Sequence, residues 1–320
     1  MRFVLTDEQE AFADAVDELV AAGGGVDVPR SWAEGSTAPG RTLWARFSEL
    51  GLTGLRVPED EGGLGGTPSD VAVVFERLGY HAVPGPYLES IAFLPHLVGP
   101  DLTQEIADGS AVVTASIAPH VPAANDADFV THRFVIAEGR IFPASVAQAI
   151  PSLAATRTLA VLTPEGEGRE VDGEVLQRAV DEAALANAAF LIGAGERLLD
   201  EAVSYTSIRT QFGRPVGGYQ AVQHALADVR VALSFARPLV QAASLSLGSP
   251  TSGRDVSAAK VAAAGAATRA ARTSLQMHGA IGYTAEHHLG LWVTVVPALV
   301  GAWGTPAFHR ARIARSILAH

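Results

Sequence analysis

Apolar residues recur at helical spacing through the first part of the chain, which predicts a helical region up to about residue 110. Thr6 followed by Gln9 fits a capping box at the start of the first helix. The apolar positions after this box share one helical face: Phe12, Val16, Leu19 and Val20. Glycines at 23–25 end the helix, and the segments 43–50 and 70–79 continue the helical region.

Between about residues 111 and 178 the pattern changes to short runs of β-branched and aromatic residues. These runs lie at 112–117, 129–136, 140–142 and 159–163, and Pro, Gly and Asn-Asp separate them. Such runs between turn residues are typical of short strands. They predict a small middle β-domain.

Helical spacing returns at about residue 181. We expect helices over 181–207, 220–247, 256–279 and from Glu286 onward, with Pro238 as a kink in the second. That second helix has an apolar stripe: Val222, Leu226, Val229 and Leu233. The prediction is an α+β multi-domain protein. It has an N-terminal helical domain (1–110), a shortened middle β-domain (111–180) and a C-terminal four-helix bundle (181–320).

Composition excludes several classes of function. The 320 residues contain no cysteine, so disulfides, thiolate catalysis and cysteine-ligated metals are excluded, and we expect no metal site. The net charge of -11 disfavours nucleic acid as a partner. Neither a signal pattern nor an apolar run of membrane-spanning length is present, so we expect a cytoplasmic protein without membrane insertion.

Two segments carry the candidate chemistry. Residues 205–223, YTSIRTQFGRPVGGYQAVQ, resemble the Y-x-x-x-R-x-Q-F-G-x-P-I-x-x-x-Q-x-V-Q signature of the acyl-CoA dehydrogenase family. Residues 276–283, QMHGAIGY, resemble that family's Q-x-x-G-G-x-G-Y, with Ala280 in place of the second glycine. The resemblance implies the three-part fold, FAD as cofactor and α,β-dehydrogenation of an acyl-CoA thioester.

The same resemblance implies which residues touch FAD, partly across a subunit boundary. An arginine offers a planar donor fork to a pyrophosphate, and a phenylalanine can pack on the adenosine. The candidates are Arg209, Gln211, Phe212, Gln220, Gln276, Gly279 and Thr305. A plainer interpretation makes Arg209 a helix C-terminal residue favoured by the helix dipole, and Gly279 a helix C-cap.

The family's usual catalytic base is missing from its usual position. The glutamate of the family's Y-E-G-T segment falls on Trp303, and an indole has no lone pair with which to accept a proton. Some relatives carry the base on the first bundle helix instead. That position falls at or beside Ala183, so the neighbouring Glu182 is a candidate base. Alternatively, Asp181 and Glu182 are favourable anions in the first turn of a helix.

The family's flavin-ring elements are also not visible. Residues 114–119 occupy the position of the T-E-P-x-x-G-S-D element without its acidic and glycine residues, and no W-I-T strand is found. The resemblance is therefore closest to the short, base-less subunit of heterotetrameric, steroid-type acyl-CoA dehydrogenases. It implies an α2β2 assembly with a second dehydrogenase-like chain, or a homo-oligomer. It also implies a bulky acyl-CoA substrate and an electron-transfer flavoprotein as candidate acceptor.

Three alternatives stay open on the sequence. The chain is a self-sufficient dehydrogenase that uses Glu182, a flavin enzyme of the same fold with other chemistry such as oxygenation, or a flavin-free scaffold. The acyl group, the partner chain and the electron acceptor are not specified by the residues, because ordinary apolar side chains line such pockets.

Overall fold

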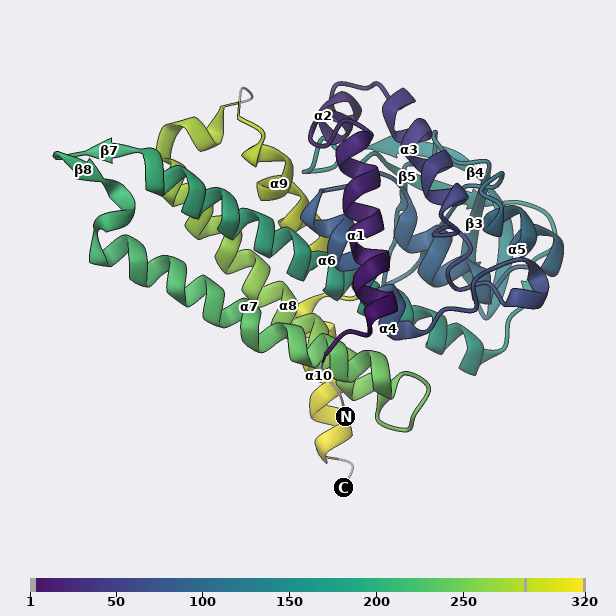
Figure 1. Ribbon diagram of the computed structural model, residues 1–320. Helices are drawn as coiled ribbons and strands as arrows, with labels where there is room; N and C mark the ends of the chain where they lie inside the picture. Colours follow the sequence, from purple (N-terminus) through teal and green to yellow (C-terminus); the bar gives the residue numbers. More distant parts are fainter. Residues whose placement is uncertain (1–3, 285–286, 319–320) are drawn as a thin grey trace.

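The computed structural model describes residues 4–284 and 287–318. Its N-terminal region contains the helices α1 (Asp7–Ala22), α2 (Asp27–Ala33), α3 (Ala38–Glu49), α4 (Pro68–Tyr80) and α5 (Pro100–Ala107). A π-helical turn, η2 (Leu88–Phe93), and 3-10 turns at Glu59–Glu61 (η1) and Leu94–His96 (η3) lie between them. This confirms the predicted helical region (Figure 1).

Local capping explains where two of these helices begin. The Thr6 hydroxyl accepts a hydrogen bond from the Gln9 backbone N–H, and the Gln9 side chain accepts one from Thr6 N–H, so the predicted capping box is confirmed. Thr67 and Asp70 form a second capping box. This second box starts α4 at Pro68, two residues before the predicted start.

The middle region is a small sheet. Its strands are β1 (Val113–Ile117), β2 (Ala124–Asn125), β3 (His132–Ala137), β4 (Arg140–Ile150), β5 (Leu159–Pro164) and β6 (Arg169–Glu170). They lie in the order β1-β3-β4-β5-β2, and β6 pairs with β4. The β1–β3 pair is parallel and the other pairs are antiparallel. The predicted strand 140–142 is the beginning of the eleven-residue β4.

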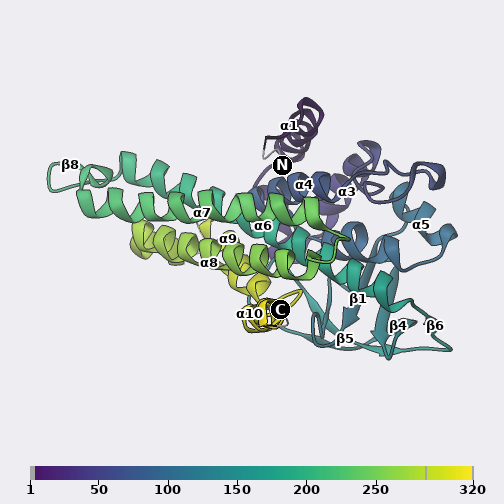
Figure 2. The ribbon, with the colours of Figure 1, turned by 90° about the horizontal axis from the view of Figure 1, so that it is seen from below.

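The C-terminal region is a helical bundle. It contains α6 (Gly173–Ile208), α7 (Gln220–Ser246), α8 (Ser252–His278), α9 (Leu289–Val300) and α10 (Pro306–Leu318). The first three are long, and the two short helices α9 and α10 share the fourth place. A hairpin of β7 (Thr210–Gln211) and β8 (Arg214–Pro215) joins α6 to α7, and lies at the end of the bundle farthest from the sheet (Figures 1 and 2).

Two details of the bundle differ from the predictions or lie beyond them. Helix α6 begins at Gly173, eight residues before the predicted start at Asp181. Asp172 caps it by accepting hydrogen bonds from the backbone N–H groups of Glu174 and Val175. Asp181 and Glu182 therefore lie in the third turn, so their assignment to a first turn is wrong. The predicted start of the last helical segment, Glu286, lies outside the described residues.

The N-terminal region packs on the bundle through glycines. A Cβ added at Gly193 of α6 would lie 1.8 Å from the backbone oxygen of Glu76, and one added at Gly79 of α4 would lie 2.0 Å from Phe190 O. Only glycine permits backbones to approach this closely. One hydrophobic core consequently extends through the N-terminal, middle and C-terminal regions.

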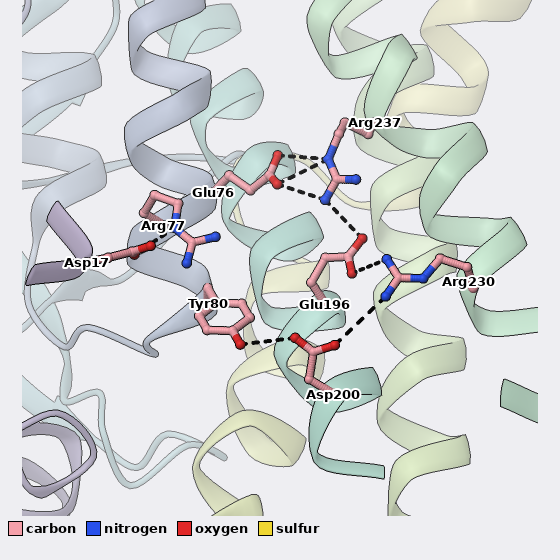
Figure 3. Close-up of polar contacts among 8 residues, drawn as sticks. All are labelled: Asp17, Glu76, Arg77, Tyr80, Glu196, Asp200, Arg230 and Arg237. Carbon is pink, nitrogen blue, oxygen red and sulfur yellow. Dashed lines mark hydrogen bonds and ion pairs between the residues drawn. The ribbon is translucent and has the colours of Figure 1, made fainter. Parts of the chain in front are cut away.

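Ion pairs fix the same helices at the surface (Figure 3). Arg237 of α7 lies 2.8 Å from Glu76 of α4 and 2.9 Å from Glu196 of α6. Arg230 also pairs with Glu196, at 2.5 Å. Arg237 therefore holds three elements of two regions together. Among the residues that the structure describes, no helix is both long and apolar enough to cross a membrane.

Candidate functional site

The hairpin after α6 presents its side chains to solvent. Gln211 pairs with Arg214, and the two residues between them, Phe212 and Gly213, have φ values of +49° and +80°. Positive φ at both central residues is the geometry of a tight hairpin turn, but it is unusual for a bulky aromatic residue. Phe212 is 93% exposed. A strained and exposed phenylalanine of this kind is typical of a site that contacts a ligand or a partner protein.

Arg209 lies at the base of this hairpin. It is exposed and extended, and its backbone N–H donates to Tyr205 O at 2.9 Å. Within residues 4–284 and 287–318 its guanidinium forms no ion pair. The neighbouring Arg214 lies over the ring of Tyr219, 4.0 Å from its centroid. Gln220, the first residue of α7, is exposed. These donors are available to an anionic ligand.

The second motif lies beside the first. The ring of Tyr205 stacks on the imidazole of His278, with centroids 4.5 Å apart, so the C-terminal ends of α6 and α8 are neighbours. Gln276 and Gly279 at this end are exposed. Gly279 has φ +62°, and nothing lies within 4 Å of a Cβ added there. His278 itself is buried and its Nδ1 lies 2.8 Å from Ser274 O, as expected of a packed histidine.

Trp303 lies at the opposite end of α8. It is 1% exposed, and its ring centroid is 4.8 Å from that of Phe93. Nε2 of His309 donates to Trp303 O at 3.0 Å, and Nδ1 of His309 faces the Ser257 hydroxyl at 3.0 Å. Burial lowers the pKa of His309 to about 4, which keeps this imidazole neutral. The Thr305 hydroxyl accepts from the Phe308 backbone N–H and so caps α10.

The predicted FAD residues therefore form one group with one exception. Ser257, beside His309, and His278 are roughly 20 residues apart on α8, which corresponds to about 30 Å along the helix. Six candidates lie at the His278 end: Arg209, Gln211, Phe212, Gln220, Gln276 and Gly279. Thr305 lies with Trp303 at the Ser257 end.

Glu182 is buried and tightly held. Nη2 of Arg56 donates to Glu182 Oε2 at 3.1 Å, Arg56 Nε donates to Oε1, and His96 Nε2 lies 3.1 Å from Oε2. Burial alone would raise the pKa of Glu182, but the hydrogen bonds and charges of His96 and Arg56 outweigh it and leave that pKa below its ordinary value. A carboxylate with a lowered pKa and three occupied contacts is a poor general base.

The two residues next to Glu182 are also inaccessible, one in an ion pair and one by burial. Nη2 of Arg312 donates to Asp181 Oδ2 at 2.9 Å, and Arg312 Nη1 donates to Oδ1. Ala183, where some relatives carry the base, is completely buried. The sequence analysis missed Arg56, His96 and Arg312 as partners of these acids, because nothing local in the sequence connects residues so far apart.

The two hydroxyl side chains of the segment 114–119 are buried in the sheet. The Thr114 side chain is buried and donates to Asn125 O at 2.8 Å, and Ser116 is also buried. The Thr114 hydroxyl therefore forms its hydrogen bond within the sheet. This agrees with the missing T-E-P-x-x-G-S-D pattern.

Comparison with known proteins places the chain in a family. The model of the acyl-CoA dehydrogenase N-terminal domain matches residues 6–94, and that of the C-terminal domain matches residues 172–318. The chain is 32% identical over 295 residues to acyl-CoA dehydrogenase IpdE2 of Mycolicibacterium smegmatis, with 90% of this chain and 92% of that relative covered. The chain belongs to the acyl-CoA dehydrogenase family.

Two solved structures show how closely this acyl-CoA dehydrogenase keeps the family fold. In the ChsE4–ChsE5 complex from Mycobacterium tuberculosis the similar chain has a TM-score of 0.86 at 21% identity, with all of both chains covered. The Tcur3481–Tcur3483 steroid acyl-CoA dehydrogenase has a TM-score of 0.83 at 21% identity and 98% coverage of each chain. At such identities the likeness establishes the fold, and it confirms the predicted three-part architecture.

Proposed function

We propose that this chain is the base-less subunit of a heteromeric, FAD-dependent acyl-CoA dehydrogenase, and that it completes the FAD site of a catalytic partner chain. The observation that carries the proposal is the distance along α8 between the candidate FAD residues and Trp303. The exposed group around Arg209 lies about 30 Å, at the helical rise per residue, from Trp303, which fills the position of the usual base.

The exposed group fits a dinucleotide. Arg209 carries an exposed guanidinium for the pyrophosphate, Phe212 offers an uncovered ring to the adenosine, and the backbone at Gly279 leaves room for a close approach. Gln211, Gln220 and Gln276 add amide donors and acceptors. When bound, FAD accepts the hydride from the β-carbon of the acyl group. The residues of this chain hold and orient it.

The proton chemistry falls to the partner in this proposal. Trp303 has no group that accepts a proton, and the Glu182 carboxylate is held by Arg56 and His96. The partner then supplies the base that removes the acidic α-proton, together with most of the flavin platform. Thr305 has no part in this shared site, because it caps α10 at the distant end.

The assembly and the substrate class extend the same proposal. An α2β2 heterotetramer agrees with the similarity to one chain of the ChsE4–ChsE5 complex. A bulky, steroid-derived acyl-CoA agrees with the similarity to a steroid acyl-CoA dehydrogenase. An electron-transfer flavoprotein would reoxidise the flavin. The place of action would be the cytoplasm.

A visible absorption spectrum tests the proposal. The chain is purified alone and after co-expression with a dehydrogenase-like chain encoded beside it, and we expect flavin bands only in the co-purified complex. Arg209→Ala should remove the flavin from that complex. Arg310→Ala, an exposed arginine on α10, is the matched control and should retain it.

Other spectra would refute the shared site. A chain that is fully flavinated alone and oxidises acyl-CoA would be self-sufficient. Oxygen-dependent product from a substrate without CoA would indicate different flavin chemistry. Colourless preparations in both cases would indicate a flavin-free scaffold.

A further inference from the structure

Three histidine rings connect the end of α8 back to α6. The His278 ring lies edge-on to His287, with centroids 5.0 Å apart, and His287 stacks on His288 at 4.7 Å. At the far end of this row, His288 Nε2 lies 2.9 Å from Glu201 Oε1, and Arg197 lies 2.7 Å from the same oxygen. The row therefore ends at an ion-paired carboxylate of α6.

The row begins and ends on one face of α6. At its near end the Tyr205 ring stacks on His278, with centroids 4.5 Å apart and planes inclined at 24°. Tyr205 and Glu201 are four residues apart, which places their side chains next to each other on the helix. The contacts thus form a closed circuit from α6 to α8, to the segment before α9, and back to α6. We call the five residues of this circuit the clamp: Glu201, Tyr205, His278, His287 and His288.

Hydrogen bonds fix two rings of the clamp. Nδ1 of His278 donates to Ser274 O at 2.8 Å, since a carbonyl oxygen can only accept. Nδ1 of His287 accepts from the Leu289 backbone N–H at 3.1 Å, at the first residue of α9. His278 is 4% exposed, and α9 lies alongside α6 (Figure 1). These two rings therefore cannot turn without the loss of a hydrogen bond or of a packed contact.

The clamp adjoins the candidate FAD residues. The Tyr205 carbonyl oxygen accepts a hydrogen bond from the Arg209 N–H at 2.9 Å, in the last turn of α6. His278 is the last residue of α8, two positions after Gln276 and directly before Gly279. Each member of the stacked pair thus belongs to the same helical turn as one of the two FAD segments. A change in the stack would move Arg209 relative to Gln276.

We propose that the clamp positions the FAD site, because it holds the ends of α6 and α8 at the separation that one dinucleotide requires. This inference rests on the proposed function, in which the exposed group around Arg209 holds FAD. Side chains that hold one ligand together must keep their relative positions to within about 0.5 Å. The other members of the clamp, His287, His288 and Glu201, are positioning residues that act through the stacked pair. Flavin affinity accordingly depends on residues outside the two FAD motifs.

Flavin affinity of the co-purified complex tests the stacked pair. His278→Ala should bind FAD about tenfold more weakly in a flavin fluorescence titration, the size expected for loss of an aromatic pair. His278→Phe keeps a stacked ring and should restore most of the affinity. The matched control is His309→Ala, because His309 is also buried and hydrogen-bonded but lies at the Trp303 end. This control should lower stability and leave flavin affinity unchanged. Equal effects of His278→Ala and His309→Ala on flavin affinity would overturn the inference.

A double-mutant cycle tests the far end of the clamp. Glu201→Gln should weaken flavin binding severalfold in the wild-type background. It should add little to His278→Ala, because the circuit is already open in that variant. Additive losses would show that Glu201 does not act through His278, and would overturn its role as a positioning residue.

A distance measurement separates this inference from the proposed function. The chain contains no cysteine, so spin labels can be attached at Ser207→Cys and Arg272→Cys, which are exposed positions of α6 and α8. The distribution of distances between these labels should be narrow in the parent chain and broader in His278→Ala, with or without flavin. His309→Ala should keep the narrow distribution. Equal widths in His278→Ala and the parent would overturn the clamp, whereas a flavin-free complex with the expected widths would refute the shared FAD site alone.

Discussion

The indole ring of Trp303 packs against the phenyl ring of Phe93, with centroids 4.8 Å apart and planes inclined at 60°. This contact joins the loop after α9 to the π-helical turn of the N-terminal region. It occupies the position at which the sequence motif predicts the family's catalytic carboxylate. The side chain that replaces the base therefore serves the packing between two regions.

Replacement of Trp303 by alanine should destabilise the fold by about 3–5 kcal/mol, as is usual for removal of a large buried aromatic side chain. Urea denaturation followed by circular dichroism measures the change. Trp303→Glu should be destabilised too, because its carboxylate would be buried beside Phe93. If the proposed partner chain supplies the base, the Trp303→Glu chain without that partner should not dehydrogenate acyl-CoA. Turnover in that variant would show that an intact active site surrounds position 303.

Glu182→Gln should lower stability and leave catalysis intact. The substitution removes the charge that faces Arg56 and His96, and loss of one member of a buried ion pair costs about 3–5 kcal/mol. Thermal unfolding measures the loss, and turnover of the flavin-bearing complex per folded molecule should remain unchanged. Full stability with flavin retained and turnover abolished would instead identify Glu182 as the base.

Arg237 should matter more for stability than Arg230, although both pair with Glu196 (Figure 3). Arg237→Ala removes hydrogen bonds to Glu76 and Glu196, takes from Glu76 the cation it faces and leaves Glu196 with Arg230 alone, for an expected loss of about 1–3 kcal/mol. Arg230→Ala removes a more exposed pair, worth less than about 1 kcal/mol. Urea unfolding measures the free energy of unfolding of both variants. Equal losses would contradict the greater importance of Arg237.

Glu201 should make the protein more sensitive to acid. Burial alone would raise its pKa, but His288 at 2.9 Å and Arg197 at 2.7 Å outweigh burial and lower the pKa of Glu201 from 4.5 to about 2. Because the folded-state pKa is the lower one, the carboxylate stabilises the fold above about pH 4.5, and this contribution is lost as the pH falls toward 2.

The variant Glu201→Gln should therefore show a shallower fall in stability between these two pH values than the wild type. Urea titrations at a series of pH values measure the slope. Glu34→Gln, at an exposed position, is the control and should keep the wild-type slope. Identical slopes for Glu201→Gln and the wild type would show that Glu201 does not cause the loss of stability in acid.

Local signals in the sequence predicted much of the fold. The capping box at Thr6 and Gln9 uses neighbouring residues, so the sequence contains all of its information. The start of α6 was misplaced because Asp172 and Gly173, its N-cap and first residue, form an Asp-Gly pair that is also typical of a turn, and only Val171 separates them from the last strand. Alternation and helical spacing overlap at such a junction.

The candidate site was predictable only where a motif spans it. The resemblance grouped Arg209 with Gln276, and the stacking of Tyr205 on His278 explains why the two segments are neighbours. The ion pairs of Asp181 and Glu182 were not predictable, because their partners Arg312 and Arg56 lie 131 and 126 positions away along the chain. Contacts of that range depend on how α6 packs in the finished fold.

Lys260 is the only lysine in the sequence, and it is 1% exposed. Its ammonium group donates to Asn187 Oδ1 and to Leu299 O inside the bundle, so it is withheld from solvent. Thioesters acylate lysine amines, and the family to which this chain belongs handles thioesters as substrates. The surface of this chain thus offers no lysine to stray acyl groups, so its lysine should remain unacylated where acyl-CoA accumulates.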